Sequence, residues 1–245
     1  MKIEYPTSHL IQVYLQRFFN NSFISLTSCI SVLGNSIGGG NMALLPGANV
    51  PGQPITGIDI PIYFQSSNKQ SKETIMIIEQ DPLRNLNEFL PIFGQQSLLH
   101  NAIIGTPNAF HSRPVKFYLN LVKELTKKGY NVYLTDKYKV YAPGLKGNKG
   151  RWTTNEKNLL IDEINSINPT FFLLFGKEAQ NAYNDIQRTL INLNQCKNNV
   201  VNVPHPSGLA NKWWKQLGLT KVTDDIKIDY ILSIIKHTGL SKPLF

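Results

Sequence analysis

Residues 74–82 read Thr-Ile-Met-Ile-Ile-Glu-Gln-Asp-Pro, an apolar run rich in β-branched residues that ends in polar residues and a proline. A run of this length, bounded by turn-forming residues, is typical of a buried strand. Three later runs have the same character: 131–135 (NVYLT), 171–175 (FFLLF) and 200–203 (VVNV). Because near-continuous apolar strands fit burial on both faces, these four runs predict the centre of a parallel sheet.

Helical patterns separate the four runs. They are expected after Thr7-Ser8, from Pro114 until Gly129, after Thr154, over 178–193, and from Thr223 or Asp224 onward. Strands that alternate with helices predict an α/β protein, a three-layer α/β/α fold with a central four-stranded, mainly parallel sheet. Glycine and proline interrupt residues 34–72, which we expect to form long loops.

We expect a single domain over residues 1–245, in which 1–72 form a helical and looping N-terminal wrap and 73–215 form the core that carries the motifs. The chain is 42% hydrophobic, which excludes a disordered protein. Its longest strongly apolar run, 171–175, is far shorter than the roughly 20 residues of a membrane-spanning helix. The first residues show no signal-peptide pattern, so we expect a cytoplasmic protein.

The composition also bears on cofactors and partners. Only two cysteines, Cys29 and Cys196, are present, and the histidines show no metal-ligand spacing, so we expect neither a metal nor another cofactor. The net charge of +9 and the pI near 9.4 suit a polyanionic partner such as DNA. A lysine-rich surface is the ordinary alternative, because 20 of the 25 basic residues are lysines.

Polar residues follow each of the four predicted strands. Gln80 and Asp81 follow the first, Asp136 ends the second, Lys177 follows the third and His205 follows the fourth. Ligands of an open α/β sheet bind just beyond the carboxyl ends of its strands. We therefore expect these side chains to meet at one edge of the sheet and to form the functional site.

Three of these strand ends resemble motifs of the uracil-DNA glycosylase superfamily. Residues 77–82 (IIEQDP) resemble its water-activating loop, a strand followed by G-Q-D-P-Y-H, and 205–210 (HPSGLA) resemble its H-P-S-P-L-S loop. Residues 174–179 (LFGKEA) are similar to the strand-to-helix turn between them. The order and spacing agree over roughly residues 70–215. The resemblance implies a DNA glycosylase that acts without a metal.

The resemblance implies two catalytic residues. Asp81 would stabilise the oxocarbenium-like sugar and orient the attacking water, although an Asp-Pro turn is the alternative. His205 would donate a hydrogen bond to the departing base, although a histidine with a structural role in the loop would look the same.

The resemblance also implies the base-binding residues. Phe110 would stack on the flipped base, unless it is a core aromatic, and Gln80 would offer its backbone N–H. Leu83 stands where the family has a tyrosine, and Thr135 or Asp136 stands where it has the asparagine that reads uracil.

Further positions are expected to contact DNA. The resemblance places Leu209 where the family carries its intercalating leucine, which would insert into the space that a flipped base leaves; burial in the core is the alternative. Ser207 and Lys212 would bind phosphates, as a solvated loop also could, and Lys177 is expected to contact DNA too. Trp213 and Trp214 are expected to anchor the last loop rather than to stack on DNA.

We therefore expect a monomeric, monofunctional DNA glycosylase that flips a pyrimidine nucleotide and hydrolyses its N-glycosyl bond. At the positions that the resemblance assigns to the base pocket, Leu83 and the Thr135-Asp136 pair with its carboxylate favour a C5-modified cytosine, hydroxymethylated or glucosylated, as found in phage DNA, and hence an anti-phage role. Base-excision repair of uracil is one alternative. A catalytically silent DNA-binding protein is the other, because Leu83-Arg84 replace the Tyr-His of the motif.

Overall fold

The computed structural model describes residues 2–4, 49–50, 53–54, 57–58, 61–66, 73–80, 113–138, 140–141, 152, 154–190 and 199–237. The helix predicted after Thr7-Ser8 lies outside these residues.

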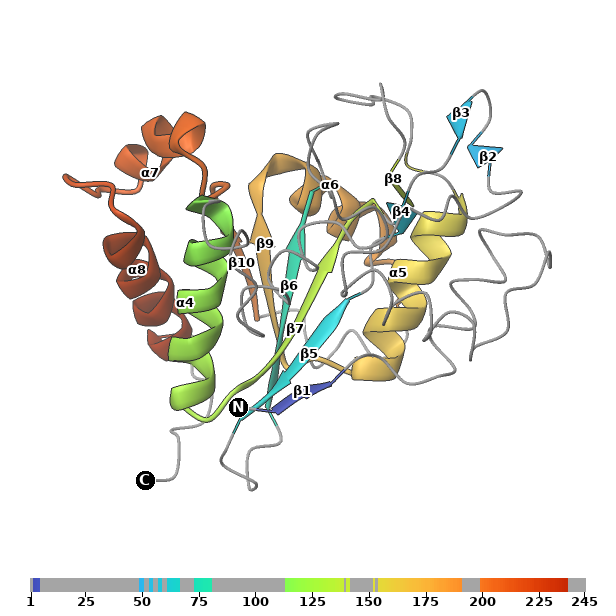
Figure 1. Cartoon of the computed structure of the whole chain (residues 1–245), viewed down its shortest axis with the longest axis horizontal. Coiled ribbons are helices and arrows are strands. Elements are labelled where there is room, and N and C mark those ends of the chain that lie inside the picture. The colour runs from blue at the N-terminus through green and yellow to red at the C-terminus, as the bar shows by residue number, and fades with distance from the viewer. Residues whose placement is uncertain are drawn as a thin grey trace, which may run out of the picture.

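The centre of the fold is a six-stranded sheet with the strand order β1-β5-β7-β6-β9-β10. Its strands are β1 (Lys2–Glu4), β5 (Ile62–Gln65), β6 (Thr74–Glu79), β7 (Asn131–Asp136), β9 (Phe171–Phe175) and β10 (Val200–Val203). Strand β6 pairs in parallel with both β7 and β9, and β9 pairs in parallel with β10. The four predicted strands and their parallel arrangement are therefore confirmed (Figure 1).

The sheet has two antiparallel strands that the sequence did not predict. Strand β5 pairs with β7, and β1 pairs with β5. Strand β5 lies inside the stretch that we expected to be loops. The apolar run between Pro61 and the following polar residues has only three members, Ile62, Tyr63 and Phe64. A run this short does not predict a strand clearly. Phe64 is nevertheless fully buried in the core. Two small ladders accompany the sheet: β2 (Asn49–Val50) with β3 (Gln53–Pro54), and β4 (Gly57–Ile58) with β8 (Val140–Tyr141).

The helices are α4 (Arg113–Lys127), α5 (Thr154–Ile167), α6 (Gly176–Ile186), the 3₁₀ turn η3 (Gly208–Ala210), α7 (Asn211–Gln216) and α8 (Asp224–His237). As predicted, α4 ends just before Gly129, which adopts a φ of +94°. The Thr223 hydroxyl accepts a hydrogen bond from the Ile226 N–H at 3.4 Å and caps α8. Within the described ranges, no helix is long and apolar enough to cross a bilayer.

Two expectations about the helices were wrong. Helix α6 ends at Ile186 rather than near 193, because residues 187–189 form a turn in which the Thr189 N–H bonds to the Ile186 carbonyl at 2.9 Å. Helix α7 was expected to be loop, since a helix of six residues leaves little periodicity to detect.

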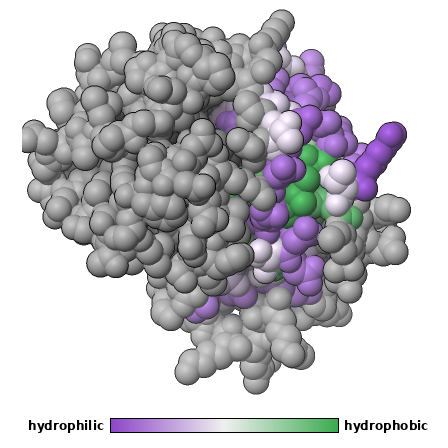
Figure 2. All heavy atoms as spheres, turned by 90° about the vertical axis from the view of Figure 1, so that its right-hand side faces the viewer, coloured by the Kyte–Doolittle hydropathy of each residue, from purple (hydrophilic) through white to green (hydrophobic). Residues whose placement is uncertain are grey.

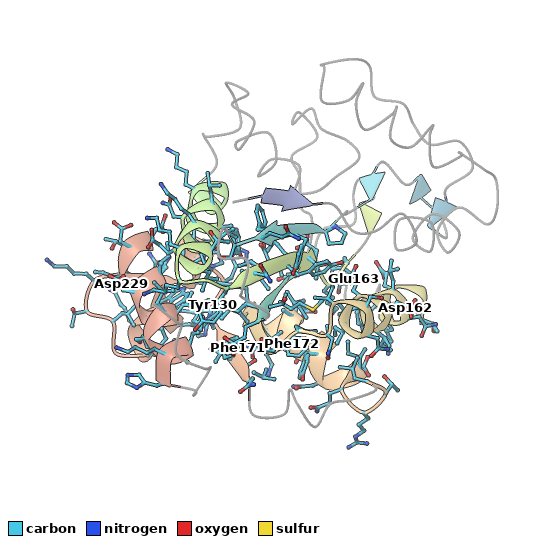
Figure 3. All side chains as sticks on the ribbon, turned by 90° about the horizontal axis from the view of Figure 1, so that it is seen from below. Tyr130, Asp162, Glu163, Phe171, Phe172 and Asp229 are labelled. Carbon is cyan, nitrogen blue, oxygen red and sulfur yellow. The ribbon has the colours of Figure 1, made fainter. Side chains whose placement is uncertain are left out.

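The side chains of the central strands alternate between two cores. On β9, Phe171, Leu173 and Phe175 pack in the core with α4 and α8, whereas Phe172 and Leu174 pack in the core with α5 and α6. Figure 3 shows Phe171 and Phe172 at the start of this strand, between the two helical layers. Figure 2 shows the side of the molecule that carries α5, where hydrophilic side chains surround a small hydrophobic area. The sheet is therefore the middle layer of a three-layer α/β/α fold.

Candidate active site

The carboxyl ends of the four parallel strands lie side by side at one end of the sheet. The last residue of β6, Glu79, is paired with Asp136 of β7, and Phe175 of β9 is paired with Val203 of β10. Because neighbouring strands lie about 4.8 Å apart, β6 and β10 are separated by roughly 10 Å at this edge. Helix α7, which follows β10 and its loop, also lies at this end of the sheet (Figure 1).

Several predicted site residues lie outside the described residues, namely Asp81, Leu83 and Phe110. Their roles stay predictions. The described members of the predicted set follow their strands as expected: Gln80 directly after β6, Lys177 in the first turn of α6, and His205 two residues beyond β10.

Two buried carboxylates end neighbouring strands on the same face of the sheet. Glu79 is 2% exposed and Asp136 is fully buried. Glu79 is two residues beyond Ile77 and Asp136 is two residues beyond Leu134, so both carboxylates point to the side of the sheet that α4 covers. The pKa of Tyr118 on α4 is raised well above its ordinary value. Burial is the largest cause, the carboxylate of Glu79 is the second, and the carboxylate of Asp136 adds to the shift. Tyr118 thus keeps its proton beside the two carboxylates.

Thr135 and Asp136, the two candidates for reading the base, point to opposite faces. The Thr135 hydroxyl donates a hydrogen bond to Oε2 of Glu163 at 2.9 Å, and Glu163 lies on α5 and is fully buried. The Thr135 side chain is therefore engaged with the α5 layer. Of the two candidates, only Asp136 lies on the face that carries Glu79.

Lys137, which directly follows β7, forms hydrogen bonds to the end of β6 and to α6. Its backbone N–H donates to the Glu79 carbonyl at 2.9 Å, and its Nζ lies 2.8 Å from Oε2 of Glu178 on α6. Burial acts to lower the pKa of Lys137, but its bonds to Glu178 and Tyr138 outweigh burial and raise the pKa overall. Lys137 therefore stays a cation, which is a poor nucleophile.

Two hydrogen bonds hold the loop that carries His205. The indole Nε1 of Trp214 on α7 donates to the His205 carbonyl at 3.0 Å. The Nζ of Lys227 on α8 donates to the next carbonyl, that of Pro206, at 2.7 Å. Trp214 and Lys227 are both fully buried. The path of the His-Pro loop is thus fixed by two interior side chains from different helices.

The imidazole of His205 is held in its neutral form. Burial lowers its pKa first, and the positive charge of Lys227 lowers it further. Nδ1 accepts a hydrogen bond from the Ser207 N–H at 3.2 Å, so in the neutral ring the proton is on Nε2. Gly176, at the junction of β9 and α6, adopts a φ of +78°, and a Cβ placed there would lie 3.6 Å from the His205 Cβ. The backbone of Gly176 thus lies close to the start of the His205 side chain, and the neutral ring can donate only through Nε2.

The segment after His205 presents side chains to solvent. Leu209 is 91% exposed, which excludes the alternative that it packs into the core. Trp214 anchors the loop as expected, but Trp213 does not, because its side chain is 47% exposed. Lys212 and Lys177 are exposed, and Ser207 is half-buried.

Sequence reasoning missed Tyr118 and Lys227. One of these left a signal: Lys227 lies four residues before Ile231 on the apolar face of α8, where a lysine is unexpected unless its ammonium has a buried partner. Tyr118 left no such signal, because a tyrosine at an apolar position of an expected helix is ordinary.

Among the described residues, no group of three histidine, cysteine or acidic side chains could hold a metal ion. Comparison with known protein families matches residues 66–227 to the uracil DNA glycosylase superfamily. Searches of curated proteins and of solved structures found no match. The matched region begins just after β5, ends within α8 and contains both His205 and the carboxyl ends of all four parallel strands. The chain therefore belongs to the uracil-DNA glycosylase superfamily.

Proposed function

We propose that this protein is a monofunctional DNA glycosylase whose substrate is a cytosine substituted at C5, such as the hydroxymethylated or glucosylated cytosine of phage DNA, and that it serves in anti-phage defence. Family membership supports glycosylase-type chemistry on DNA. The observation that carries the choice of base is the burial of Asp136 at the end of β7, on the face of Glu79.

The reaction needs two groups. Breaking the N-glycosyl bond leaves its electron pair on the base and positive charge on the sugar. The neutral His205, with its proton on Nε2, is suited to donate a hydrogen bond to the anionic base. Asp81 would stabilise the cationic sugar and orient the water that adds to C1′.

Base selection follows from what a carboxylate can bind. An ionised Asp136 only accepts hydrogen bonds, and the exocyclic amine of cytosine is a donor. Uracil presents a carbonyl oxygen at the same position, and that unpaired polar contact would cost about 1–3 kcal/mol. Leu83 in place of the family's tyrosine would leave room for a substituent at C5. Both changes favour a modified cytosine, and such bases occur in phage DNA.

To test this proposal, the protein is incubated with matched oligonucleotides that carry uracil, cytosine, 5-hydroxymethylcytosine or glucosylated 5-hydroxymethylcytosine. Released bases are measured by mass spectrometry and abasic sites by alkaline strand cleavage. We expect release of modified cytosine and little release of uracil. Efficient release of uracil without release of modified cytosine would contradict the proposed base and support uracil repair.

Asp81→Asn is the matched catalytic control, because it removes a charge and keeps the shape of the side chain. We expect it to bind DNA in a gel-shift assay like the wild type and to lower turnover by orders of magnitude. Wild-type turnover in this variant would refute the role of Asp81. DNA binding without base release by the wild type, on every oligonucleotide, would identify a silent DNA-binding protein.

A further inference from the structure

The exposed hydrophobic side chains of the described residues are not scattered. Leu209, Trp213 and Leu217 are the three large hydrophobic residues classed as exposed there, at 91%, 47% and 40%. They recur every four residues along η3, α7 and the residue that caps α7. The buried residues Ala210 and Trp214 of the same segment are also four apart, so the three exposed residues follow one another along its outward side. We call this row the 209–217 stripe.

The inner face of the same segment is fixed. Ala210 and Trp214 are buried, and the Trp214 indole bonds to the His205 carbonyl. The stripe is therefore held rigidly relative to the catalytic loop, because Trp213 is the direct neighbour of the anchoring residue.

The surroundings of the stripe are positively charged. Residues 205–223 contain Lys212, Lys215 and Lys221 and no aspartate or glutamate. The Lys212 Nζ lies 4.2 Å from the centre of the Trp213 ring, within the range of a cation–π contact. A half-exposed aromatic ring beside lysines is the arrangement that proteins use to bind single-stranded nucleic acid, with a base on the ring and phosphates on the cations.

We propose that the 209–217 stripe is a second DNA-binding element, in which Trp213 stacks on a base of the strand that flanks the flipped nucleotide and Lys212 and Lys215 contact phosphates. This inference rests on the proposed function for its DNA substrate. It separates two tasks on one segment. Leu209 fills a space that exists only in a duplex, whereas stacking on Trp213 needs an unstacked base and no partner strand.

The first measurement is the affinity for a single-stranded oligonucleotide by fluorescence anisotropy. Since stacking contributes about 1–3 kcal/mol per base, we expect Trp213→Ala to raise Kd roughly 5- to 150-fold. Trp213→Phe keeps an aromatic face and is expected to retain most of the affinity. Leu209→Ala is the comparison variant within the stripe, because its loss should lower turnover on duplexes more than it lowers single-strand affinity. Equal affinities of Trp213→Ala and the wild type would overturn the proposal.

Tryptophan fluorescence gives a readout that does not depend on catalysis. The chain has three tryptophans, and Trp214 is fully buried. In a Trp152→Phe background, single-stranded DNA should quench a signal that Trp213→Phe removes. Absence of quenching would contradict stacking. If Trp213→Ala changes self-association, measured by sedimentation, and not the affinity for DNA, the stripe contacts a second copy of the chain instead.

The two proposals can fail separately. If Trp213 is quenched by DNA but no base is released, the glycosylase function fails and the stacking surface stands. If base is released and Trp213→Ala binds and turns over like the wild type, the glycosylase stands and the stacking surface fails.

Discussion

Replacing Trp214 by phenylalanine tests whether the His205 loop is held from the interior. The substitution keeps a ring in a fully buried position but removes the Nε1–H that reaches the His205 carbonyl at 3.0 Å. Leaving a partly buried carbonyl without its donor costs about 1–3 kcal/mol, before any loss of packing from the smaller ring. For a chain of this size, about 1 kcal/mol lowers Tm by about 2–4 °C, so we expect a decrease of about 2–12 °C.

Trp213→Phe is the matched control, because it makes the same chemical change at the next residue, which is 47% exposed. We expect its free energy of unfolding to stay within about 0.5 kcal/mol of the wild type. Both variants are measured by thermal and urea unfolding without DNA. If His205 acts in catalysis as proposed, base release in single-turnover assays should also slow in Trp214→Phe, because the His205 carbonyl loses its hydrogen-bond donor. Equal stabilities of the two variants would refute the idea that this hydrogen bond fixes the loop.

Two further predictions concern the same loop. Because the pKa of His205 is lowered by burial and by Lys227, the neutral ring should persist below pH 6.5, and the acidic limb of base release that His205 causes should lie below that pH. In Lys227→Met the limb should move to higher pH, as read from pH–rate profiles and from ring NMR signals, and an unmoved limb would contradict the role of Lys227. The unfolded chain takes up this proton more readily than the folded one, so His205 should also make the folded state less stable as pH falls below 6.5. Gly176→Ala and Gly218→Ala should each lower the free energy of unfolding by about 1–2 kcal/mol, because both positions have φ near the left-handed region, +78° and +91°. The methyl group meets only an ordinary contact at Gly176 and open space at Gly218, so a much larger loss at Gly176 would show that contact with His205, not the backbone, sets the cost.

The parallel centre of the fold could be predicted from the sequence because each of its strands is a compact apolar run bounded by polar or turn residues. The antiparallel edge could not. Strand β5 buries Phe64 but offers only four residues, and β1 has three. At that length the pairing partner, rather than the local sequence, decides whether a strand forms.

The sequence predicts which residues lie at the candidate site, because they follow the ends of the strands. It does not predict which side chains face one another, because packing between the sheet and the helices decides this. The alternation of side chains separates Thr135 from Asp136, but only the register with β6 and the position of α4 show which face carries Glu79. In the same way, the sequence does not indicate which of the adjacent tryptophans, Trp213 or Trp214, is buried. One is buried and the other exposed because η3 and α7 lie at the edge of the core, with a single face turned inward.

Lys227 joins two properties that enzymes often adjust separately. One ammonium group supports the backbone beside His205 and also disfavours a proton on its ring. A substitution there would remove a hydrogen bond from the His205 loop and raise the pKa of the His205 ring in a single step. Variation at this position should therefore be accompanied by compensating changes in the surrounding helices, and a search for acid-tolerant or alkali-tolerant variants of this protein would do better to alter the outer face of α8 than its buried lysine.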